Sequence, residues 1–383
     1  MNFKDSTWLG LTSFLAFGFS IVLIGPMIPI IEKSYNVSHS YIGLALSLGS
    51  LSFLFSSLLF GLLIEKGNTY YLFKTGMIVF SLSIIIFIFM GSYKLFVLGE
   101  ILLNFGGAGI EIYIPFLIGV IGKEKKAKNL NLIHSTFALG AIISPIILSL
   151  SIKYTTYWKI PLFIALFLTL IPHLFLFRLR TRIQNLHTNY LRETIPIKNI
   201  ITKSLVILIM ALSLYVAYEA NFSSWISVFL HEAKGLPLSR ATIFPSLLWL
   251  GLFLGRIIFS DLPEKFGYKR WLIMTILLSF IFLLLIIILK NTIISAFLTL
   301  ILGLLFATIY PTIQAEIVER YKSNKGIALS ISSATMSITS GITSYLVGYI
   351  AQIFGILSGF ITILSFILFD LFFILFYKEQ KSK

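Results

Sequence analysis

The chain has 383 residues, of which 57% are hydrophobic and 12% charged, and its formal net charge is +15. Soluble domains usually carry about twice that charged fraction. The composition therefore excludes an ordinary soluble globular protein and predicts a protein embedded in a membrane. The chain has no cysteine, which excludes a disulfide framework and a thiolate metal site.

Apolar stretches long enough to cross a bilayer recur along the whole chain. The first begins near residue 8; it is too long for the core of a signal peptide and has no cleavage pattern, so we expect a retained first span. Twelve spans are predicted, near residues 7–31, 40–64, 70–90, 95–121, 130–152, 160–177, 204–230, 240–260, 271–289, 292–318, 326–351 and 356–377.

The basic residues that flank these spans predict their orientation. Most of the 30 Lys and Arg residues lie at the N-terminus, in alternate loops and at the C-terminus, for example within 123–128 and 178–182. The positive-inside rule then predicts that both termini are cytoplasmic. The charges are distributed over short loops rather than over one folded face. They indicate topology and attraction to anionic headgroups, not nucleic-acid binding.

The two halves of the chain resemble each other. A polar segment, 178–203, separates residues 1–177 from residues 204–383, with six predicted spans in each half. Pro115 and Pro311 are 196 residues apart, and Glu65 and Glu264 are 199 apart. A nearly constant offset indicates an internal repeat, here with both halves in the same orientation. We therefore expect an all-α membrane protein of two six-helix bundles joined by a cytoplasmic linker.

A charged motif follows the second predicted span of each half. The chain reads Glu264-Lys265-Phe266-Gly267-Tyr268-Lys269-Arg270 after span 8, and a degenerate copy at 61–67 follows span 2. An acid and a base at a helix end can hold neighbouring helices together in one conformation and release them in another. The alternative is a loop made basic for topology alone. The span 8 copy resembles the cytoplasmic loop motif of the major facilitator superfamily, acid-base-x-Gly-x-base-base.

Within that superfamily, four further segments resemble the fucose permease-like branch, which also holds sodium–glucose transporter-like proteins. They are Tyr215 to Glu219 followed by Trp225, Phe253 to Arg256, Tyr310 to Ile313, and Leu130 to His134 followed by Pro145. The resemblance implies a sugar transporter of the major facilitator fold that uses a coupling ion.

Two positions depart from fucose permease. Gly25 stands where that protein has an acid in span 1, and Glu111 precedes the Pro115-Phe116 pair by four residues instead of five. Since one residue of slip rotates a helical side chain by about 100°, the coupling role of the permease's span 4 acid does not transfer to Glu111.

The residues themselves predict a translocation path. A carboxylate at the centre of a span costs about 2.5–3.5 kcal/mol on the insertion scale, so Glu111 and Glu219 should face protein or water rather than lipid. Glu100, Asn104, Gly107, Glu111 and Pro115 share one face of span 4, and Tyr215, Tyr218, Glu219, Phe222 and Trp225 form a stripe along span 7. Aromatic rings and hydrogen-bonding groups around a carboxylate suit a sugar.

The predicted substrate-binding and coupling site comprises Glu219, Glu111, Asn104, His134, Tyr215, Tyr218, Asn221, Trp225, Trp249, Tyr310 and Gln314. The predicted charge latch comprises Gly61, Glu65, Lys66, Arg256, Glu264, Lys265, Gly267, Lys269 and Arg270.

Alternatives stay open for several of these residues. Glu219 could be a structural partner of a basic group or of Asn221. His134 could cap or pack at the start of span 5, and Trp225 could be an interfacial aromatic residue. From depth alone, we expect Arg256 to pair with Glu316 or Asp370.

No enzyme is predicted, because the chain has no metal-ligand cluster, no H-E-x-x-H and no nucleophile elbow. We expect no catalytic residue, metal or cofactor. The glycines at 106–109 lie inside a span with no strand before them, so they favour helix packing over a nucleotide loop. With no soluble domain to bind ATP, transport should be driven by an ion gradient or run downhill.

The leading hypothesis is a plasma-membrane symporter, monomeric, that moves a sugar or polyol with a proton or sodium by alternating access. A proton-linked exporter of drugs or metabolites is the alternative; the stretch 144–149 lacks the glycines that such antiporters carry around a proline in span 5. A transporter-shaped sensor without net flux is the third hypothesis.

Overall fold

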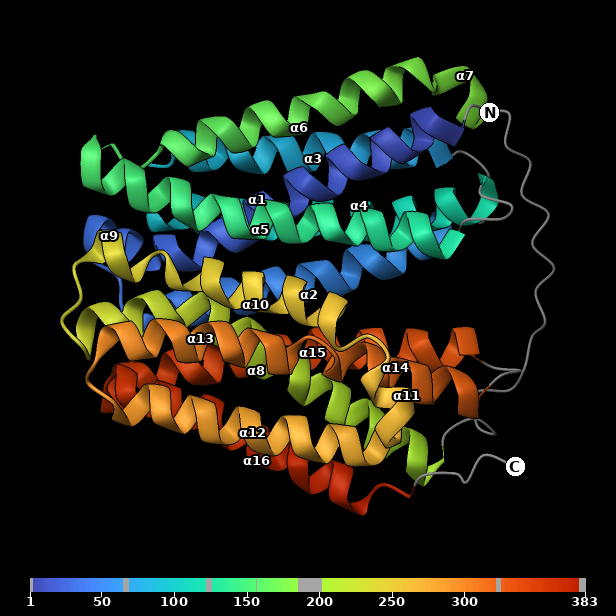
Figure 1. Ribbon diagram of the computed structural model, residues 1–383. Helices are drawn as coiled ribbons and strands as arrows, with labels where there is room; N and C mark the ends of the chain where they lie inside the picture. The colour runs from blue at the N-terminus through green and yellow to red at the C-terminus, as the bar shows by residue number, and fades with distance from the viewer. Residues whose placement is uncertain are drawn as a thin grey trace. The chain divides into compact units, whose positions relative to one another are not determined.

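The computed structural model describes residues 3–64, 69–121, 126–155, 157–184, 202–321 and 325–378, and all regular structure within them is helical (Figure 1). The helices are α1 (Phe3–Tyr35), α2 (His39–Ile64), α3 (Thr69–Phe89), α4 (Tyr93–Ile121), α5 (Lys126–Tyr154), α6 (Ile160–Arg178), α7 (Arg180–Gln184), α8 (Lys203–Glu232), α9 (Leu238–Ala241), α10 (Phe244–Ile258), α11 (Leu262–Phe266), α12 (Tyr268–Ile288), α13 (Thr292–Phe306), α14 (Ile309–Arg320), α15 (Lys325–Phe354) and α16 (Ile356–Phe376). The predicted all-α class is confirmed.

Eleven helical stretches of 19 to 30 residues within the described ranges are long and apolar enough to cross a membrane. About 20 apolar residues suffice for a bilayer core of about 30 Å. The predicted span at 326–351 falls in α15, which has the length but is rich in serine and threonine, among them Ser330, Thr335 and Ser340. These hydroxyl residues lower the hydropathy of α15, so the twelfth span stays a prediction.

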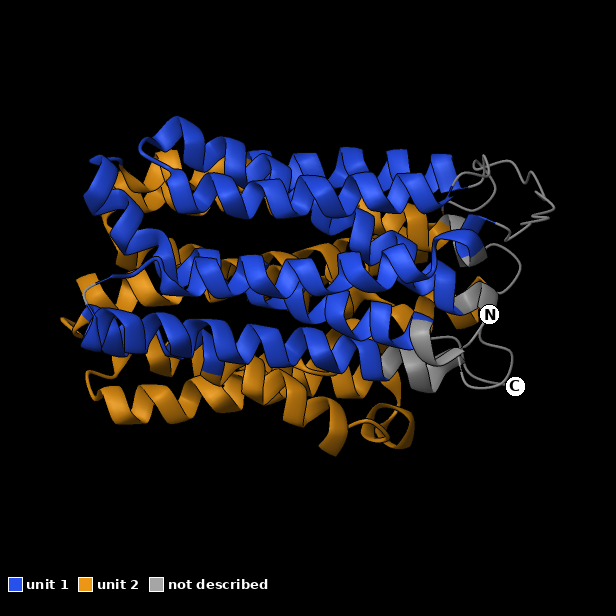
Figure 2. Cartoon of the chain, turned by 90° about the horizontal axis from the view of Figure 1, so that it is seen from above, with its two compact units in different colours: residues 1–37, 48–192, 238–246 blue, residues 38–47, 193–237, 247–383 orange. Residues whose placement is uncertain are grey.

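The chain divides into two compact units (Figure 2). Unit 1 comprises residues 1–37, 48–192 and 238–246, and unit 2 comprises 38–47, 193–237 and 247–383. Each unit thus takes a short segment from the other half of the sequence: the first turns of α2 belong to unit 2, and α9 with the start of α10 belongs to unit 1. Most of the predicted linker lies outside the described residues, and the predicted domain limits stay a prediction.

Glycines set the closest helix crossings of unit 1. In α1, a Cβ added to Gly18 would lie 2.1 Å from the carbonyl oxygen of Phe137 in α5, and a Cβ added to Gly140 would lie 2.4 Å from that of Leu15. In α4, a Cβ on Gly106 would meet the backbone nitrogen of Phe80 at 2.6 Å. The backbones touch because these side chains are absent. Gly106 therefore has the packing role predicted for the glycine run of span 4.

Helix α8 lies at the centre of unit 2, where it packs mainly against α15 and α16. The side chains of Tyr215, Tyr218, Phe222, Trp225 and Phe229 are all buried. The ring of Phe229 stacks on Phe360 of α16, with 4.1 Å between centroids. A helix buried on most of its faces is held firmly. The polar groups of α8 are therefore fixed in position by the packing around them.

The repeat extends to individual contacts within each unit. In unit 1, the hydroxyl of Tyr35 donates to the carbonyl of Met90, just past α3, at 2.8 Å. In unit 2, Nζ of Lys234 donates to the carbonyl of Leu289, just past α12, at 2.7 Å. Both donor and acceptor are shifted by 199 residues, which is the offset of the charged motifs. Tyr35 is the last residue of α1, and Lys234 follows the end of α8. Each donor satisfies a carbonyl that the end of another helix leaves without an intrahelical partner.

Substituting Gly18 by alanine should destabilise the protein by about 1–3 kcal/mol, because the added methyl group meets a backbone oxygen that cannot move aside. Thermal unfolding in detergent measures the effect. Gly91→Ala is the matched control, since a Cβ at Gly91 has open space around it. Equal unfolding temperatures for the two variants would contradict the close crossing of α1 and α5.

Substituting Lys234 by methionine should cost about 1–3 kcal/mol, because the carbonyl of Leu289 and the hydroxyl of Ser295, 3.1 Å from Nζ, lose their donor. Burial lowers the pKa of Lys234 to about 8, whereas an unfolded chain has the ordinary lysine value of about 10.4. The unfolded state then binds more protons between these values, so stability from Lys234 rises with pH through that window.

Unfolding of the wild type and of Lys234→Met, followed from pH 7 to pH 10, should therefore show a widening difference in stability. The neutral amine still donates to the carbonyl after it has lost the desolvation cost of its charge. A difference that narrows above pH 8 would show that Lys234 acts only through its charge.

Candidate functional site

Glu219 lies in the middle of α8, partly exposed, with one hydroxyl and one cation near it. Its carboxyl group hydrogen-bonds the Tyr215 side chain, and Arg256 of α10 lies within electrostatic reach. The depth-based pairing of Arg256 with Glu316 or Asp370 is not what the structure shows. Glu316 lies 3.9 Å from Nε of Arg320 instead, and Asp370 accepts a hydrogen bond from Tyr218.

Residues of α13 and α14 complete the surroundings of Glu219. The Tyr215 hydroxyl donates to the carbonyl of Phe306 at 3.0 Å, and its ring lies 6.3 Å from that of Tyr310. The Gln314 amide in turn donates to the Tyr310 hydroxyl at 2.7 Å. Four predicted site residues therefore meet in unit 2: Glu219, Tyr215, Tyr310 and Gln314.

Trp249 extends this polar cluster along α8. Its indole Nε1 donates to the Ser223 hydroxyl at 3.1 Å, one helical turn past Glu219, and the ring is partly exposed. A partly exposed ring beside a carboxyl group can stack on the CH-rich face of a solute. Of the described tryptophans of unit 2, Trp249 is the one that is partly exposed, whereas Trp225 and Trp271 are buried.

Asn221 and Trp225 are placed differently, because both are fully buried. The Asn221 amide donates to the carbonyl of Ala217 at 2.8 Å and to Thr343 at 3.3 Å. The Trp225 ring lies edge-on to His39, with 5.7 Å between centroids. These side chains hold α8 against its neighbours in unit 2, and in this structure neither is accessible to a solute.

Tyr218, the remaining predicted aromatic, leads to an acid that the sequence interpretation did not include in the site. Its hydroxyl donates to Oδ2 of Asp370 in α16 at 3.0 Å, and both side chains are fully buried. Asp370 lies in the middle of a predicted span, at the same insertion cost as Glu219. That cost was the signal in the sequence that could have identified it.

Unit 1 contains a second buried acid that the predicted site did not include. Glu100 is 2% exposed, and its Oε2 accepts from the Asn104 amide at 3.1 Å. A Cβ added to Gly49 of α2 would lie 2.6 Å from Nδ2 of Asn104. The pair therefore occupies space that this glycine leaves free. The sequence placed Glu100 on the same helix face as Asn104 but left it out of the site.

Glu111 and His134 are both exposed. Glu111 lies three turns beyond Glu100 on the same face of α4 and makes no hydrogen bond with the described residues. His134 lies more than two turns inside α5, so it does not cap that helix; its ring is edge-on to Phe14, with 5.0 Å between centroids. Unit 1 thus presents an acid and an imidazole on accessible surface.

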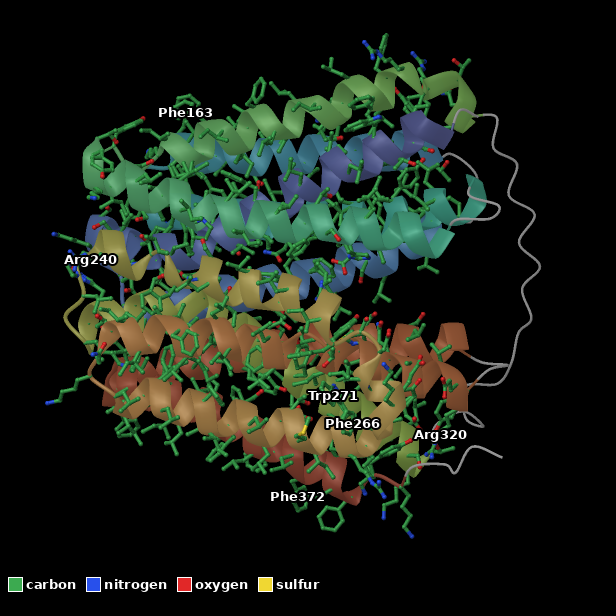
Figure 3. All side chains as sticks on the ribbon, viewed as in Figure 1. Phe163, Arg240, Phe266, Trp271, Arg320 and Phe372 are labelled. Carbon is green, nitrogen blue, oxygen red and sulfur yellow. The ribbon has the colours of Figure 1, made fainter. Side chains whose placement is uncertain are left out.

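The charged motif of unit 2 connects helix ends. Gly267, with φ of +83°, separates α11 from α12, and Nζ of Lys269 donates to the carbonyls of Leu375 and Tyr377 at the end of α16, at 2.9 and 2.6 Å. Phe266 packs against Trp271 at the same end of unit 2 as Arg320 (Figure 3). Lys269 therefore ties α12 to α16.

The other predicted latch residues divide into two sets. Glu264, Lys265 and Arg270 are exposed on α11 and α12, and Gly61 is exposed near the end of α2. Glu65 and Lys66 lie outside the described residues.

Comparisons with known proteins agree on one family. The model of the Major Facilitator Superfamily matches residues 10–324 and 262–383. The chain is 21% identical to the glucose/mannose transporter GlcP of Bacillus subtilis (strain 168) over 342 residues, which cover 85% of this chain and 83% of GlcP. It is 26% identical to a TsgA homologue of Buchnera aphidicola subsp. Baizongia pistaciae over 290 residues, 70% of each chain.

Solved structures show the same fold. A D-xylose-proton symporter superposes with a TM-score of 0.81 at 14% identity over 100% of both chains. The nucleoside transporter NupG superposes with a TM-score of 0.75 at 15% identity over 98% of both chains. With the family match, the apolar helices identify an integral, multi-pass membrane protein. The family is one of transporters rather than enzymes. The chain belongs to the Major Facilitator Superfamily of small-molecule transporters.

Proposed function

We propose that the protein is a sugar or polyol symporter, driven by a proton gradient, whose coupling group is Glu219. It would work by alternating access between two six-helix bundles, with α15 as the twelfth span and both termini in the cytoplasm. The observation that carries the proposal is that Glu219 is partly exposed, hydrogen-bonds Tyr215 and lies within electrostatic reach of Arg256. The relative described as a glucose/mannose transporter supports the choice of solute.

The cluster around Glu219 offers the groups that a sugar requires. Trp249 and Tyr310 are partly exposed rings, and Gln314 has an amide beside the Tyr310 hydroxyl. Sugars combine CH faces, which stack on aromatic rings, with hydroxyl groups that need hydrogen-bonding partners. Glu111 of unit 1 is accessible and has no hydrogen-bonding partner among the described residues. It would accept hydrogen bonds from solute hydroxyl groups.

The contacts of Glu219 suit both of its protonation states. A carbonyl oxygen can only accept, so the Tyr215 hydroxyl gives its hydrogen to Phe306 and has its oxygen free as an acceptor. Protonated Glu219 can donate to that oxygen. When Glu219 loses its proton, Arg256 balances the charge. The bound proton thereby removes the free-energy cost of an unpaired carboxylate while access to the site changes from one side of the membrane to the other.

Substituting Glu219 by glutamine should abolish accumulation against a concentration gradient, because the amide cannot carry the proton. We expect pH-gradient-driven uptake of labelled glucose, mannose or xylose into proteoliposomes to fall by at least about tenfold, equivalent to 1.4 kcal/mol. Exchange of labelled for unlabelled sugar at equal pH should persist.

Glu232→Gln is the control, since Glu232 is an exposed acid at the end of the same helix. Undiminished accumulation by Glu219→Gln would exclude Glu219 as the coupling group. Accumulation driven by sodium alone would exclude the proton. Failure of every sugar, combined with proton-driven drug or metabolite movement, would favour the exporter.

Substituting Trp249 by alanine should raise the sugar concentration that half-saturates exchange by about two- to tenfold, the equivalent of 0.5–1.5 kcal/mol of lost aromatic contact. Trp249→Phe, which keeps an aromatic ring, should stay closer to the wild type. Equal values for alanine and wild type would show that the solute does not stack on this ring.

A further inference from the structure

Three tyrosine–acid pairs occupy the interior of unit 2. Glu219 pairs with Tyr215, Asp370 with Tyr218, and Glu316 with Tyr377. Two of these acids also have an arginine: Arg256 lies within reach of Glu219, and Arg320 contacts Glu316. Among the described residues, Asp370 has no cation. It is therefore the acid whose negative charge nothing in unit 2 balances.

The surroundings of Asp370 are closed on every side. Its side chain is 0% exposed, and α8, α12 and α15 pack against α16. From α8, the titratable side chain that faces it is Tyr218. Residues 271–288 of α12 and 328–354 of α15 contain no acidic or basic residue, and the tyrosines of that part of α15, Tyr345 and Tyr349, are exposed.

The nearby lysine of α12 does not serve as the missing cation. Nζ of Lys269 is held by the carbonyls of Leu375 and Tyr377, more than one turn past Asp370. Oδ1 of Asp370 has no hydrogen-bonding partner among the described residues. The Asp370 carboxyl group therefore relies on one hydrogen bond, from Tyr218.

One hydrogen bond does not compensate a buried charge. Removing an ion from water costs more free energy than a single hydrogen bond to the charged group returns. A proton on the carboxyl group removes that cost. The two acids are also linked: the rings of Tyr218 and Tyr215 meet edge to face with centroids 5.3 Å apart, and Tyr218 lies within electrostatic reach of both carboxyl groups.

We propose that Asp370 is a second proton-binding site of this transporter, and that it keeps its proton throughout transport. With one arginine near the linked pair of acids, a second negative charge would oppose the ionisation of Glu219. A permanently neutral Asp370 leaves Glu219 as the carboxyl group of this network that changes charge. The second part of this inference rests on the proposed role of Glu219; the bound proton itself does not.

Infrared spectroscopy of the purified protein at neutral pH tests the bound proton directly. Wild type minus Asp370→Asn should show the carbonyl-stretch band of one protonated carboxylic acid. Tyr218→Phe should shift the frequency of that band, because the carboxyl group loses its hydrogen bond. Glu316→Gln is the control and should leave the band in place, since Glu316 has partners of its own in Tyr377 and Arg320.

The proposal is overturned if neither Asp370→Asn nor Tyr218→Phe changes the carbonyl-stretch band. If Asp370→Asn does not fold, the band of Tyr218→Phe alone decides whether Asp370 carries the proton. In proteoliposomes, Asp370→Asn should keep proton-driven accumulation while Glu219→Gln loses it. If Asp370→Asn loses accumulation while the wild type shows the band, the proton on Asp370 leaves during transport. That result would overturn the inference that Asp370 keeps its proton throughout transport. If no solute is transported at all, the infrared result still stands.

Discussion

The cost of placing a carboxyl group inside a bilayer constrains this molecule more than any other interaction. Among the residues that the structure describes, each acid in the interior of unit 2 hydrogen-bonds a tyrosine. Arg256 also lies within electrostatic reach of Glu219, and Arg320 contacts Glu316. Such groups persist in membrane helices where they serve a path or a proton. In the proposed account these partners divide the acids by role: Glu219 changes charge during transport, and Asp370 stays neutral.

The packing around α8 makes this sorting possible. Its buried rings, such as Phe229 on Phe360, leave the helix little freedom. The tyrosine hydroxyls of α8 are consequently held at fixed places, and each acid keeps its own partner. In unit 1, glycines allow the helices to pack closely, and the backbones of α1 and α5 are in contact at Gly18 and Gly140. Close packing within each bundle suits the proposed alternating access, in which a bundle moves as a body.

Much of the fold and part of the site could be predicted from the sequence. Hydropathy predicted the helices because a bilayer requires long apolar segments. The residue pattern also predicted that Glu219, Tyr215, Tyr310 and Gln314 would lie together, as they do in unit 2. Asp370 was predicted only as a partner of Arg256, and Glu100 only as a member of the polar face of span 4, although the cost of burying a carboxyl group applies to both. The partner of Arg256 was mistaken because depth along a helix does not fix the face on which a neighbour lies. Trp225 was a candidate for solute contact from its place in a stripe, but tertiary packing buries it completely.

The central claim is that sugar and proton move together through the cluster at Glu219. Proteoliposomes that contain the wild-type protein and an internal pH-sensitive dye test it most directly. With no pH gradient imposed, a sugar gradient directed inward should acidify the interior, because each sugar brings a proton down the same path. Sugar entry without any change in internal pH would contradict the account.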